Sequence, residues 1–216
     1  MKKRTLGLLF FLLSGTIMMN VTAQDIKLPS PDKKGGKPLM QALNERQSMR
    51  SFTKDNLSQQ QLSDLLWAAW GINRPDDRRT APSAMNDQEI DMYVTLPEGL
   101  YLYLAKSHSL KLIKKGDLRR LTGTQSFVGS AALNLVYVAD LGKSGKSEGE
   151  KIDDSDLLLS YANTAFIAQN VYLYCASANL GCIVRGSISK DRLATEMGLR
   201  SNQKITLAQT VGVPDK

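Results

Sequence analysis

The stretch LSDLLWAAWGINRPDDRRTAPSAMNDQEIDMYVTL, residues 62–96, places a helix, a loop and a strand in immediate succession. Leucine, alanine and tryptophan recur at helical spacing in its first third, and Gly71 ends that run. Just upstream, Ser58 and Gln61 form a capping box, which marks the start of the helix. A helix followed so closely by a strand predicts a fold that mixes both kinds of element around one sheet.

The second half of this stretch leads into the sheet. Residues 72–89 lack helical periodicity and contain two prolines, which predicts a long loop. Apolar residues alternate from 90 to 96 and again from 100 to 104, on either side of Pro97-Glu98-Gly99, and this pattern predicts a β-hairpin. Residues 133–139 (LNLVYVA) are mostly apolar, as expected of a strand that is covered on both faces.

Further segments complete the predicted α+β domain. A short helix is expected to end near Arg46, with Leu39, Met40 and Leu43 directed inward. Apolar residues almost surround a second, longer helix at 155–179, so we expect it to be central and buried. The remaining predictions are helices at 117–129 and 190–197, the latter capped by Ser189, a mobile loop at 140–153 and a last strand at 205–213.

The chain of 216 residues divides into three parts. Residues 1–24 have a basic start, an apolar run and a small-residue ending, which predicts a secretory signal peptide, with an uncleaved membrane anchor as the alternative. We therefore expect the protein to be exported, periplasmic or otherwise extracytoplasmic, with no membrane association after cleavage. Residues 25–37 are polar and rich in Pro and Gly, and are expected to form a flexible leader. Residues 38–216 have the length of one domain.

The charge of the chain does not indicate nucleic-acid binding. The formal net charge is +7, but Lys2, Lys3 and Arg4 would leave with the signal peptide, which reduces the charge to +4. That value is ordinary for a soluble protein. No nucleic-acid partner is therefore expected.

Several kinds of catalytic site lack the residues they need. His108 is the single histidine, which leaves little material for a zinc site or a histidine triad, and no metal is expected. Residues 142–147 (GKSGKS) resemble a phosphate-binding loop, but Asp140 stands where that motif requires glycine. Cys175 and Cys182 could pair in an oxidising compartment. We expect buried thiols instead, because a helix would separate the two residues by roughly 10 Å along its axis.

Two segments offer groups that could hold a phosphorylated, planar ligand. Residues 46–52 (RQSMRSF) place Arg46 and Arg50 on either side of Ser48, which suits a phosphate dianion. Residues 79–88 (RTAPSAMNDQ) gather proline, small residues and amides in a loop, which could read the donors and acceptors of a flavin's pyrimidine half. Basic helix ends are more often solvated, so neither segment alone establishes a site.

In this order and spacing the two segments resemble those of the nitroreductase family of FMN flavoproteins. In that family an Arg-x-Ser-x-Arg/Lys segment holds the FMN phosphate and ribityl chain, and a Pro-Ser-x-x-Asn-x-Gln segment reaches the flavin from the partner subunit. The likeness extends over about Leu39 to Lys216. Residues 62–74 and 79–94 look closest to a compact branch that includes thiazoline- and oxazoline-oxidising relatives.

The resemblance implies a nitroreductase-like fold, in which helices flank a central, mainly antiparallel sheet and a homodimer holds FMN at its interface. It assigns no catalytic side chain, because the flavin carries the chemistry. The implied cofactor-binding residues are Arg46, Gln47, Ser48, Arg50, Pro82, Ser83, Ala84, Asn86, Gln88, Ile183, Val184, Gly186 and Lys216. Two positions depart from many relatives, which have Arg or His at Gln47 and in some cases Glu at Arg185.

The implied activity is ping-pong hydride transfer from NAD(P)H, or another electron donor, to a small-molecule acceptor such as a nitroaromatic or quinone. Two alternatives remain open at this point. The flavin could instead oxidise a substrate in the reverse direction, as in the compact branch, or the protein could bind flavin without turnover.

Overall fold

The structure is a computed structural model that describes residues 23–215. The predicted signal peptide lies outside these residues except for its last two positions, and Lys216 lies outside them as well. The strands are β1 (Ile26–Lys27), β2 (Ile90–Leu96), β3 (Gly99–Leu104), β4 (Ser109–Lys115), β5 (Leu133–Asp140), β6 (Gly181–Arg185) and β7 (Gln203–Gly212). The α-helices are α1 (Leu39–Glu45), α2 (Gln59–Trp70), α3 (Asp154–Ser177) and α4 (Lys190–Met197), and the 3-10 turns are η1 (Ala84–Asn86), η2 (Arg119–Thr122), η3 (Ser126–Gly129) and η4 (Leu141–Ser144).

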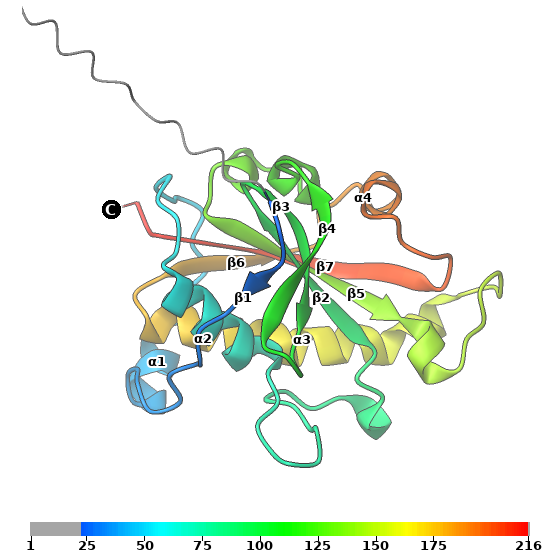
Figure 1. Ribbon diagram of the computed structural model, residues 1–216, viewed down its shortest axis with the longest axis horizontal. Helices are drawn as coiled ribbons and strands as arrows, with labels where there is room; N and C mark the ends of the chain where they lie inside the picture. The colour runs from blue at the N-terminus through cyan, green and yellow to red at the C-terminus, as the bar shows by residue number, and fades with distance from the viewer. Residues whose placement is uncertain (1–22, 216) are drawn as a thin grey trace, which may run out of the picture.

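The seven strands form one sheet in the order β1-β4-β3-β2-β5-β7-β6, and every neighbouring pair is antiparallel (Figure 1). All residues of β5 are buried, which confirms the prediction of a strand covered on both faces. β2 and β3 pair up to Leu96 and Gly99, which confirms the predicted hairpin. β6 is an edge strand, and its free edge is important for the site below.

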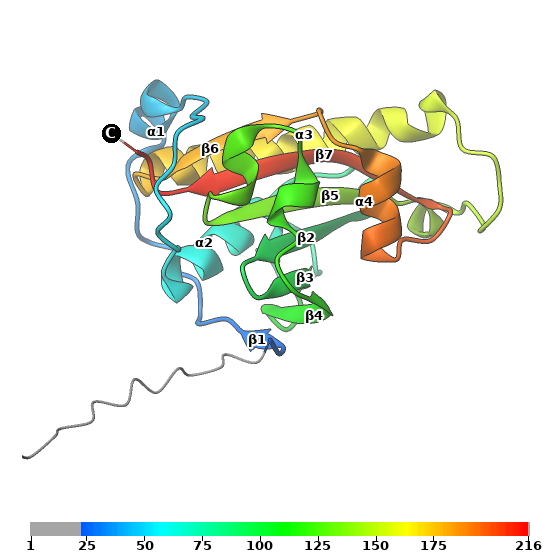
Figure 2. The same ribbon diagram turned by 90° about the horizontal axis from the view of Figure 1, so that it is seen from above.

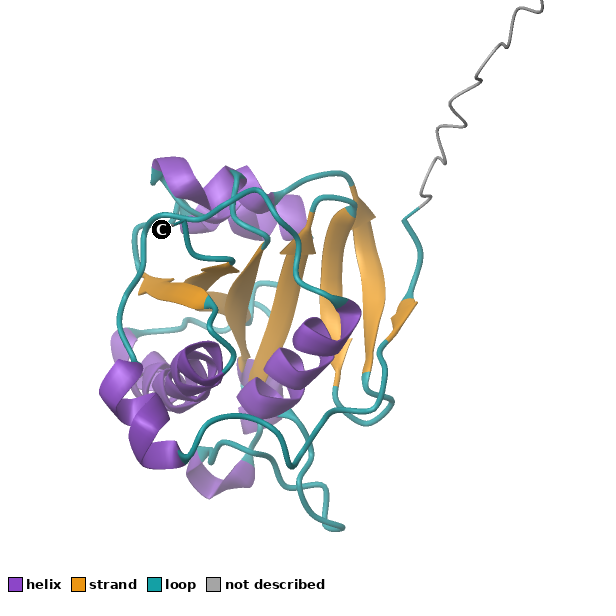
Figure 3. Cartoon of the chain, turned by 90° about the vertical axis from the view of Figure 1, so that its left-hand side faces the viewer, coloured by secondary structure: helices purple, strands orange, loops and turns teal. Residues whose placement is uncertain are grey.

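Helices cover both faces of the sheet (Figures 2 and 3). α2 and α3 pack against one face, where Leu65, Leu66 and Ile167 are fully buried in the larger hydrophobic core. α4 packs against the opposite face, where Leu193 and Met197 join strand residues in a second cluster. The sheet is therefore the middle layer of an α+β domain, as the sequence predicts.

The start of α2 follows from its sequence. Ser58 Oγ accepts the N–H of Gln61, and the Gln61 side chain accepts the N–H of Ser58, so the predicted capping box is present. α4 has its predicted bounds, but Ser189 makes no side-chain hydrogen bond at its N-terminus. The capping box thus marks the start of α2, whereas the cap predicted at Ser189 is wrong although the bounds of α4 are as expected.

The leader, residues 25–37, is part of the domain and not the independent flexible segment expected from its composition. Its β1 pairs with β4, and Leu28 is only 5% exposed and belongs to the larger core. Lys37 Nζ donates to Asn179 Oδ1 at 2.6 Å and to the carbonyl of Ala176 at 3.0 Å, at the end of α3. These contacts join the leader to residues far away in sequence, and the amino-acid composition of the leader cannot predict them.

The region between β3 and β5 differs from the prediction. β4 was not predicted, because a strand this rich in lysine, with only the two-residue β1 beyond it in the sheet, carries little apolar alternation. The helix expected at 117–129 is instead two 3-10 turns, η2 and η3. Gly123 ends the first turn in an extended conformation, and this interrupts the helical spacing.

The loop expected to be mobile, residues 140–153, is held in place by hydrogen bonds to the segment before β7. Gly149 N–H donates to Ser201 Oγ at 3.0 Å, and Asn202 Nδ2 donates to the carbonyl of Lys146 at 2.9 Å. These partners lie about 50 residues away in sequence, so the Gly/Ser/Lys composition of the loop could not reveal them.

Cys175 and Cys182 are buried free thiols, as predicted, but they are neighbours. The chain reverses after α3, where the N–H of Leu180 donates to the carbonyl of Cys175 at 2.8 Å. Burial raises the pKa of the Cys175 thiol, and a hydrogen bond with Cys182 raises this pKa further. The predicted separation along a helix axis was wrong because β6 folds back beside α3.

Two helices leave apolar side chains exposed, contrary to expectation. On α1, Leu39, Met40 and Leu43 point outward and only Ala42 is buried. On α3, one face is buried against the sheet, whereas Leu158 is 69% and Phe166 is 48% exposed. Within residues 23–215, no helix has both the length and the apolar character that crossing a membrane requires.

Candidate functional site

Residues 46–50, here the arginine segment, lie along the free edge of β6. The N–H of Met49 donates to the carbonyl of Cys182 at 3.0 Å. Just beyond, Phe52 pairs with Pro214, and the N–H of Thr53 donates to the carbonyl of Val213 at 2.9 Å. The arginine segment follows α1 directly. A backbone hydrogen bond to β6, and those of the next residues to the end of β7, hold it along the sheet edge.

The arginine segment presents a set of unused donors. Among residues 23–215, the guanidiniums of Arg46 and Arg50 make no ion pair and no hydrogen bond. The backbone N–H groups of Gln47, Ser48 and Arg50 likewise have no acceptor in this described part of the chain. Two cations and free N–H groups suit a phosphate dianion, so this donor set fits the FMN phosphate.

A pocket of about 750 Å³ adjoins the segment. Its lining includes Arg46, Gln47 and Met49 of the segment together with Tyr172 and Pro214, but not Ser48 or Arg50. The pocket thus combines the segment with the C-terminal half of α3 and the end of β7. Its volume lies within the range of small-molecule sites.

β6 supplies backbone groups next to Tyr172, which lines this pocket. Val184 donates its N–H to the hydroxyl of Tyr172 at 3.0 Å, and not to β7, so the carbonyl of Val184 also points toward the free edge. The N–H of Gly186 has no acceptor within residues 23–215. The side chain of Ile183 packs with Phe52 in a separate cluster. Of the predicted β6 residues, Val184 and Gly186 therefore offer backbone hydrogen-bonding groups at the free edge.

Arg185 points toward the opposite side from Tyr172. It is 5% exposed, and its guanidinium donates to Thr122 O at 2.7 Å, Asn134 Oδ1 at 3.0 Å and Thr210 Oγ1 at 3.0 Å. Burial lowers the pKa of this guanidinium to about 10. Arg185 is therefore a buried cation with neutral partners, and its side chain belongs to the core beside η2.

Residues 82–88, here the amide loop, are held by internal hydrogen bonds. Gln88 Nε2 donates to Asn86 Oδ1 at 3.2 Å, and Gln88 Oε1 accepts from Arg79 Nε at 2.7 Å. Ser83 Oγ accepts the N–H of Gln88 at 3.1 Å. Met85, Asn86 and Gln88 all have positive φ, from 49° to 61°, an unusual backbone for residues other than glycine.

α3 anchors the amide loop through a buried pair. The N–H of Ala84 donates to Asn163 Oδ1 at 3.1 Å, and Asn163 Nδ2 donates to Glu89 Oε1 at 2.9 Å. The N–H of Ala84 is therefore already used within the chain. The hydroxyl proton of Ser83 and the Nδ2 group of Asn86 remain as donors that could meet a ligand, beside the exposed ring of Pro82.

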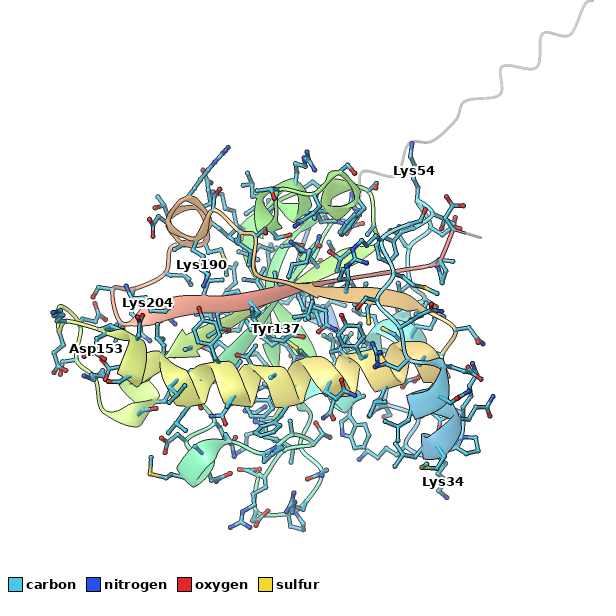
Figure 4. The ribbon with its side chains drawn as sticks, turned by 180° about the vertical axis from the view of Figure 1, so that it is seen from behind. Lys34, Lys54, Tyr137, Asp153, Lys190 and Lys204 are labelled. Carbon is cyan, nitrogen blue, oxygen red and sulfur yellow. The ribbon has the colours of Figure 1, made fainter. Side chains whose placement is uncertain are left out.

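One chain does not bring the two predicted segments together. The amide loop contacts α3 at Asn163 and the arginine segment contacts it at Tyr172, and nine residues of helix correspond to about 14 Å. In Figure 4, Asp153 marks one end of α3, and the arginine segment lies near the other end, below Lys54. Sequence reasoning missed Asn163 and Tyr172, because helical periodicity was their only signal.

Comparisons with known proteins agree on one family. The model described as "Nitroreductase family" matches residues 43–213. A crystal structure of a candidate nitroreductase from Ralstonia eutropha JMP134 is 43% identical, with a TM-score of 0.83, and covers 91% of this chain and 92% of that chain. A candidate nitroreductase from Methanocaldococcus jannaschii is 27% identical over 159 residues, which are 69% of this chain and 78% of the relative. A candidate nitroreductase from Desulfovibrio desulfuricans, solved in complex with FMN, shares the fold at 18% identity and a TM-score of 0.58, covering 83% and 88% of the two chains.

Proposed function

The chain belongs to the nitroreductase family, and on that basis we propose that it is an FMN-dependent oxidoreductase that works as a homodimer. The observation that carries this proposal is the placement of the two ligand-binding segments. Each segment contacts α3, but at positions about 14 Å apart along it. A second copy related by two-fold symmetry would supply the missing half to each site.

The surface of α3 supports such a dimer. Leu158, Leu159 and Phe166 are exposed on one face of this helix, between the two anchoring positions or just before them. A contiguous exposed apolar face of this kind is typical of protein–protein contact. Pairing through this face would place the amide loop of each subunit near the arginine segment of its partner.

Within each site, we assign separate tasks to the two segments. Arg46 and Arg50 would neutralise the phosphate of FMN, and the N–H groups and hydroxyl around Ser48 would bind its oxygens. Ser83 and Asn86 of the partner subunit would supply donors to the planar ring. Bound FMN supplies the capacity to accept and release hydride, and the protein binds and orients it.

We propose a reduced nicotinamide as the electron donor, and a nitroaromatic or quinone as the acceptor, binding in turn at the same site. We also propose, from the predicted signal peptide, that the protein is exported and acts outside the cytoplasm. Because nicotinamides are scarce there, another donor could serve in their place.

The first test is flavin binding by the purified protein. We expect a flavin absorbance spectrum, or its recovery when FMN is added to the colourless protein. The double variant Arg46→Ala/Arg50→Ala should weaken FMN affinity by at least about 100-fold, because two charge-assisted interactions are lost. Lys34→Ala/Lys204→Ala removes two exposed cations away from the arginine segment and should bind as the wild type does (Figure 4).

The outcomes separate clearly. If the wild-type protein binds no FMN, the proposed function is wrong. If both double variants bind FMN equally well, the flavin is held elsewhere, and the assignment of the arginine segment is wrong. Turnover of NADH or NADPH with a quinone then distinguishes an enzyme from a protein that only binds flavin.

A further inference from the structure

Tyr172 contacts both the arginine segment and β6, the two parts of one site that come from the same subunit. It lies on α3, about one and a half turns before Ser177 ends the helix, and is 8% exposed. Its hydroxyl lies 2.9 Å from Ser48 Oγ in the arginine segment and 3.0 Å from the N of Val184 in β6. The guanidinium of Arg46 lies over its ring, 5.4 Å from the centroid. No other described side chain forms hydrogen bonds to both the arginine segment and β6.

The hydroxyl of Tyr172 also determines how Ser48 can bond. A phenol has one proton to donate and lone pairs that accept. Because the N–H of Val184 occupies the oxygen as an acceptor, the phenol proton is available to Ser48 Oγ. When the phenol donates to Ser48 Oγ, Ser48 keeps its own hydroxyl proton for an acceptor outside the chain, such as a ligand oxygen.

The same hydroxyl marks the point where backbone pairing along the β6 edge stops. The carbonyl of Cys182 is paired with the N–H of Met49, and the next outward N–H, that of Val184, is taken by Tyr172. The following outward N–H, that of Gly186, is free among residues 23–215. Tyr172 thus lies between the part of the edge that the chain fills itself and the part left for a ligand.

We propose that Tyr172 is a positioning residue that fixes the arginine segment relative to the free edge of β6. This inference rests on the proposed function, in which the arginine segment holds the phosphate side of FMN, and it adds that the free edge of β6 faces the flavin ring. Without the hydroxyl, the two parts would still be present, but their relative position would be less constrained. The ligand would then bind more weakly and in a less uniform environment.

The test compares Tyr172→Phe with Tyr174→Phe. Tyr172→Phe keeps the ring, its packing and the contact with Arg46, and removes only the hydroxyl. Tyr174 is a matched control on the same helix, because its hydroxyl donates to the carbonyl of Gln61 in α2 at 3.1 Å and does not contact the arginine segment or β6. We expect Tyr172→Phe to weaken FMN affinity about tenfold and to shift the visible absorbance and reduction potential of the bound flavin. Tyr174→Phe should lower only the thermal midpoint of the flavin-free protein.

A cycle with Ser48→Ala tests whether Tyr172 acts through Ser48. The double variant Ser48→Ala/Tyr172→Phe should bind FMN about as weakly as the worse single variant, because both changes break the same connection. Fully additive losses would show two independent contributions and overturn the relay to Ser48. Wild-type affinity, spectrum and potential in Tyr172→Phe would overturn the inference as a whole. A wild-type protein that binds no FMN would instead contradict the proposed function.

Discussion

At the scale of single residues, His108 connects the leader to the sheet and to α2. Its Nε2 lies 2.7 Å from Ser63 Oγ, which in turn donates to the carbonyl of Pro29 at 2.6 Å. Its Nδ1 lies 3.0 Å from the hydroxyl of Tyr103. Burial lowers the pKa of the imidazole below its ordinary value, against an opposing effect of the Pro29 backbone. The single histidine of the chain is thus a structural group remote from the arginine segment.

We expect the folded protein to lose stability as the pH falls from about 7.5 to about 5.5. Because the pKa of His108 is lower in the folded chain, the unfolded chain binds more protons over this interval, and acidification favours unfolding. The urea midpoint should therefore decrease toward the lower pH in the wild type, and decrease less in His108→Gln. An equal decrease in both proteins would contradict this assignment, since ordinary carboxylates remain ionised throughout this range.

The sequence indicated residue types at the site but not which of their groups are free. The spacing of Arg46, Ser48 and Arg50 was visible in the sequence, but of these three residues only Arg46 lines the pocket. Similarly, the N–H of Ala84 is taken by Asn163, and the amide of Gln88 is used inside the loop. These bonds depend on tertiary neighbours, so no local pattern could predict them. Contact of the predicted residues with FMN, Ala84, Gln88 and Lys216 included, stays a prediction.

At the scale of elements, the leader adds a strand and a core residue to the domain. β1 extends the sheet beyond β4, and the N–H of Leu28 donates to the carbonyl of His108 at 3.3 Å. The side chain of Leu28 is buried, whereas the preceding Lys27 is exposed. The leader therefore contributes apolar burial that a mobile segment would not.

Replacement of Leu28 measures that contribution. Leu28→Ala should lower the free energy of unfolding by about 2–4 kcal/mol, because it leaves a cavity in the larger core. Lys27→Ala, next to it on the exposed side, should change this free energy by less than about 0.5 kcal/mol. Urea denaturation followed by circular dichroism compares the two. Equal, small effects would show that the leader is detached in solution.

Elements with strong local signals were predictable, and elements defined by distant partners were not. α2 has a capping box and an apolar stripe, and the β2–β3 hairpin has a short turn, so both followed from the sequence. β1 pairs with β4, and β4 pairs in turn with β3, and neither β1 nor β4 has a strong sequence pattern of its own. Edge strands are stabilised by the sheet they join, which local propensity does not describe.

At the scale of the whole molecule, α3 is the element that the sequence described only in part. Apolar residues on nearly all sides predicted a buried helix, and one face is indeed buried against β5, β6 and β7. Its other face, with Leu158, Leu159 and Phe166, is exposed in the single chain. The pattern indicated that this face is apolar, but could not indicate that it is exposed in the single chain, where the proposed second subunit would cover it.

A charge on this face should separate the proposed subunits. Phe166→Glu would bury a carboxylate in an apolar contact, and we expect the dimer dissociation constant to rise by at least about 30-fold. FMN content should fall in parallel, because each site would lose its second half. Ile113→Glu on β4, at a comparably exposed apolar position, is the control and should change neither quantity. Light scattering and flavin absorbance on the same samples give both values, and a monomer that retains FMN would refute the shared site.

The position of β7 has a consequence for the order in which the protein can be assembled. β7 comes latest in the chain of the described strands, yet it lies inside the sheet between β5 and β6, and the residues after it pair with the segment around Phe52. During synthesis, β6 has no strand to pair with until β7 has left the ribosome. The segment around Phe52, which follows the arginine segment, likewise lacks its partners until residues 213 and 214 have emerged. We therefore expect FMN to bind only after synthesis. Fragments that lack β7 should expose the unpaired edges of β5 and β6, aggregate, and contain no flavin.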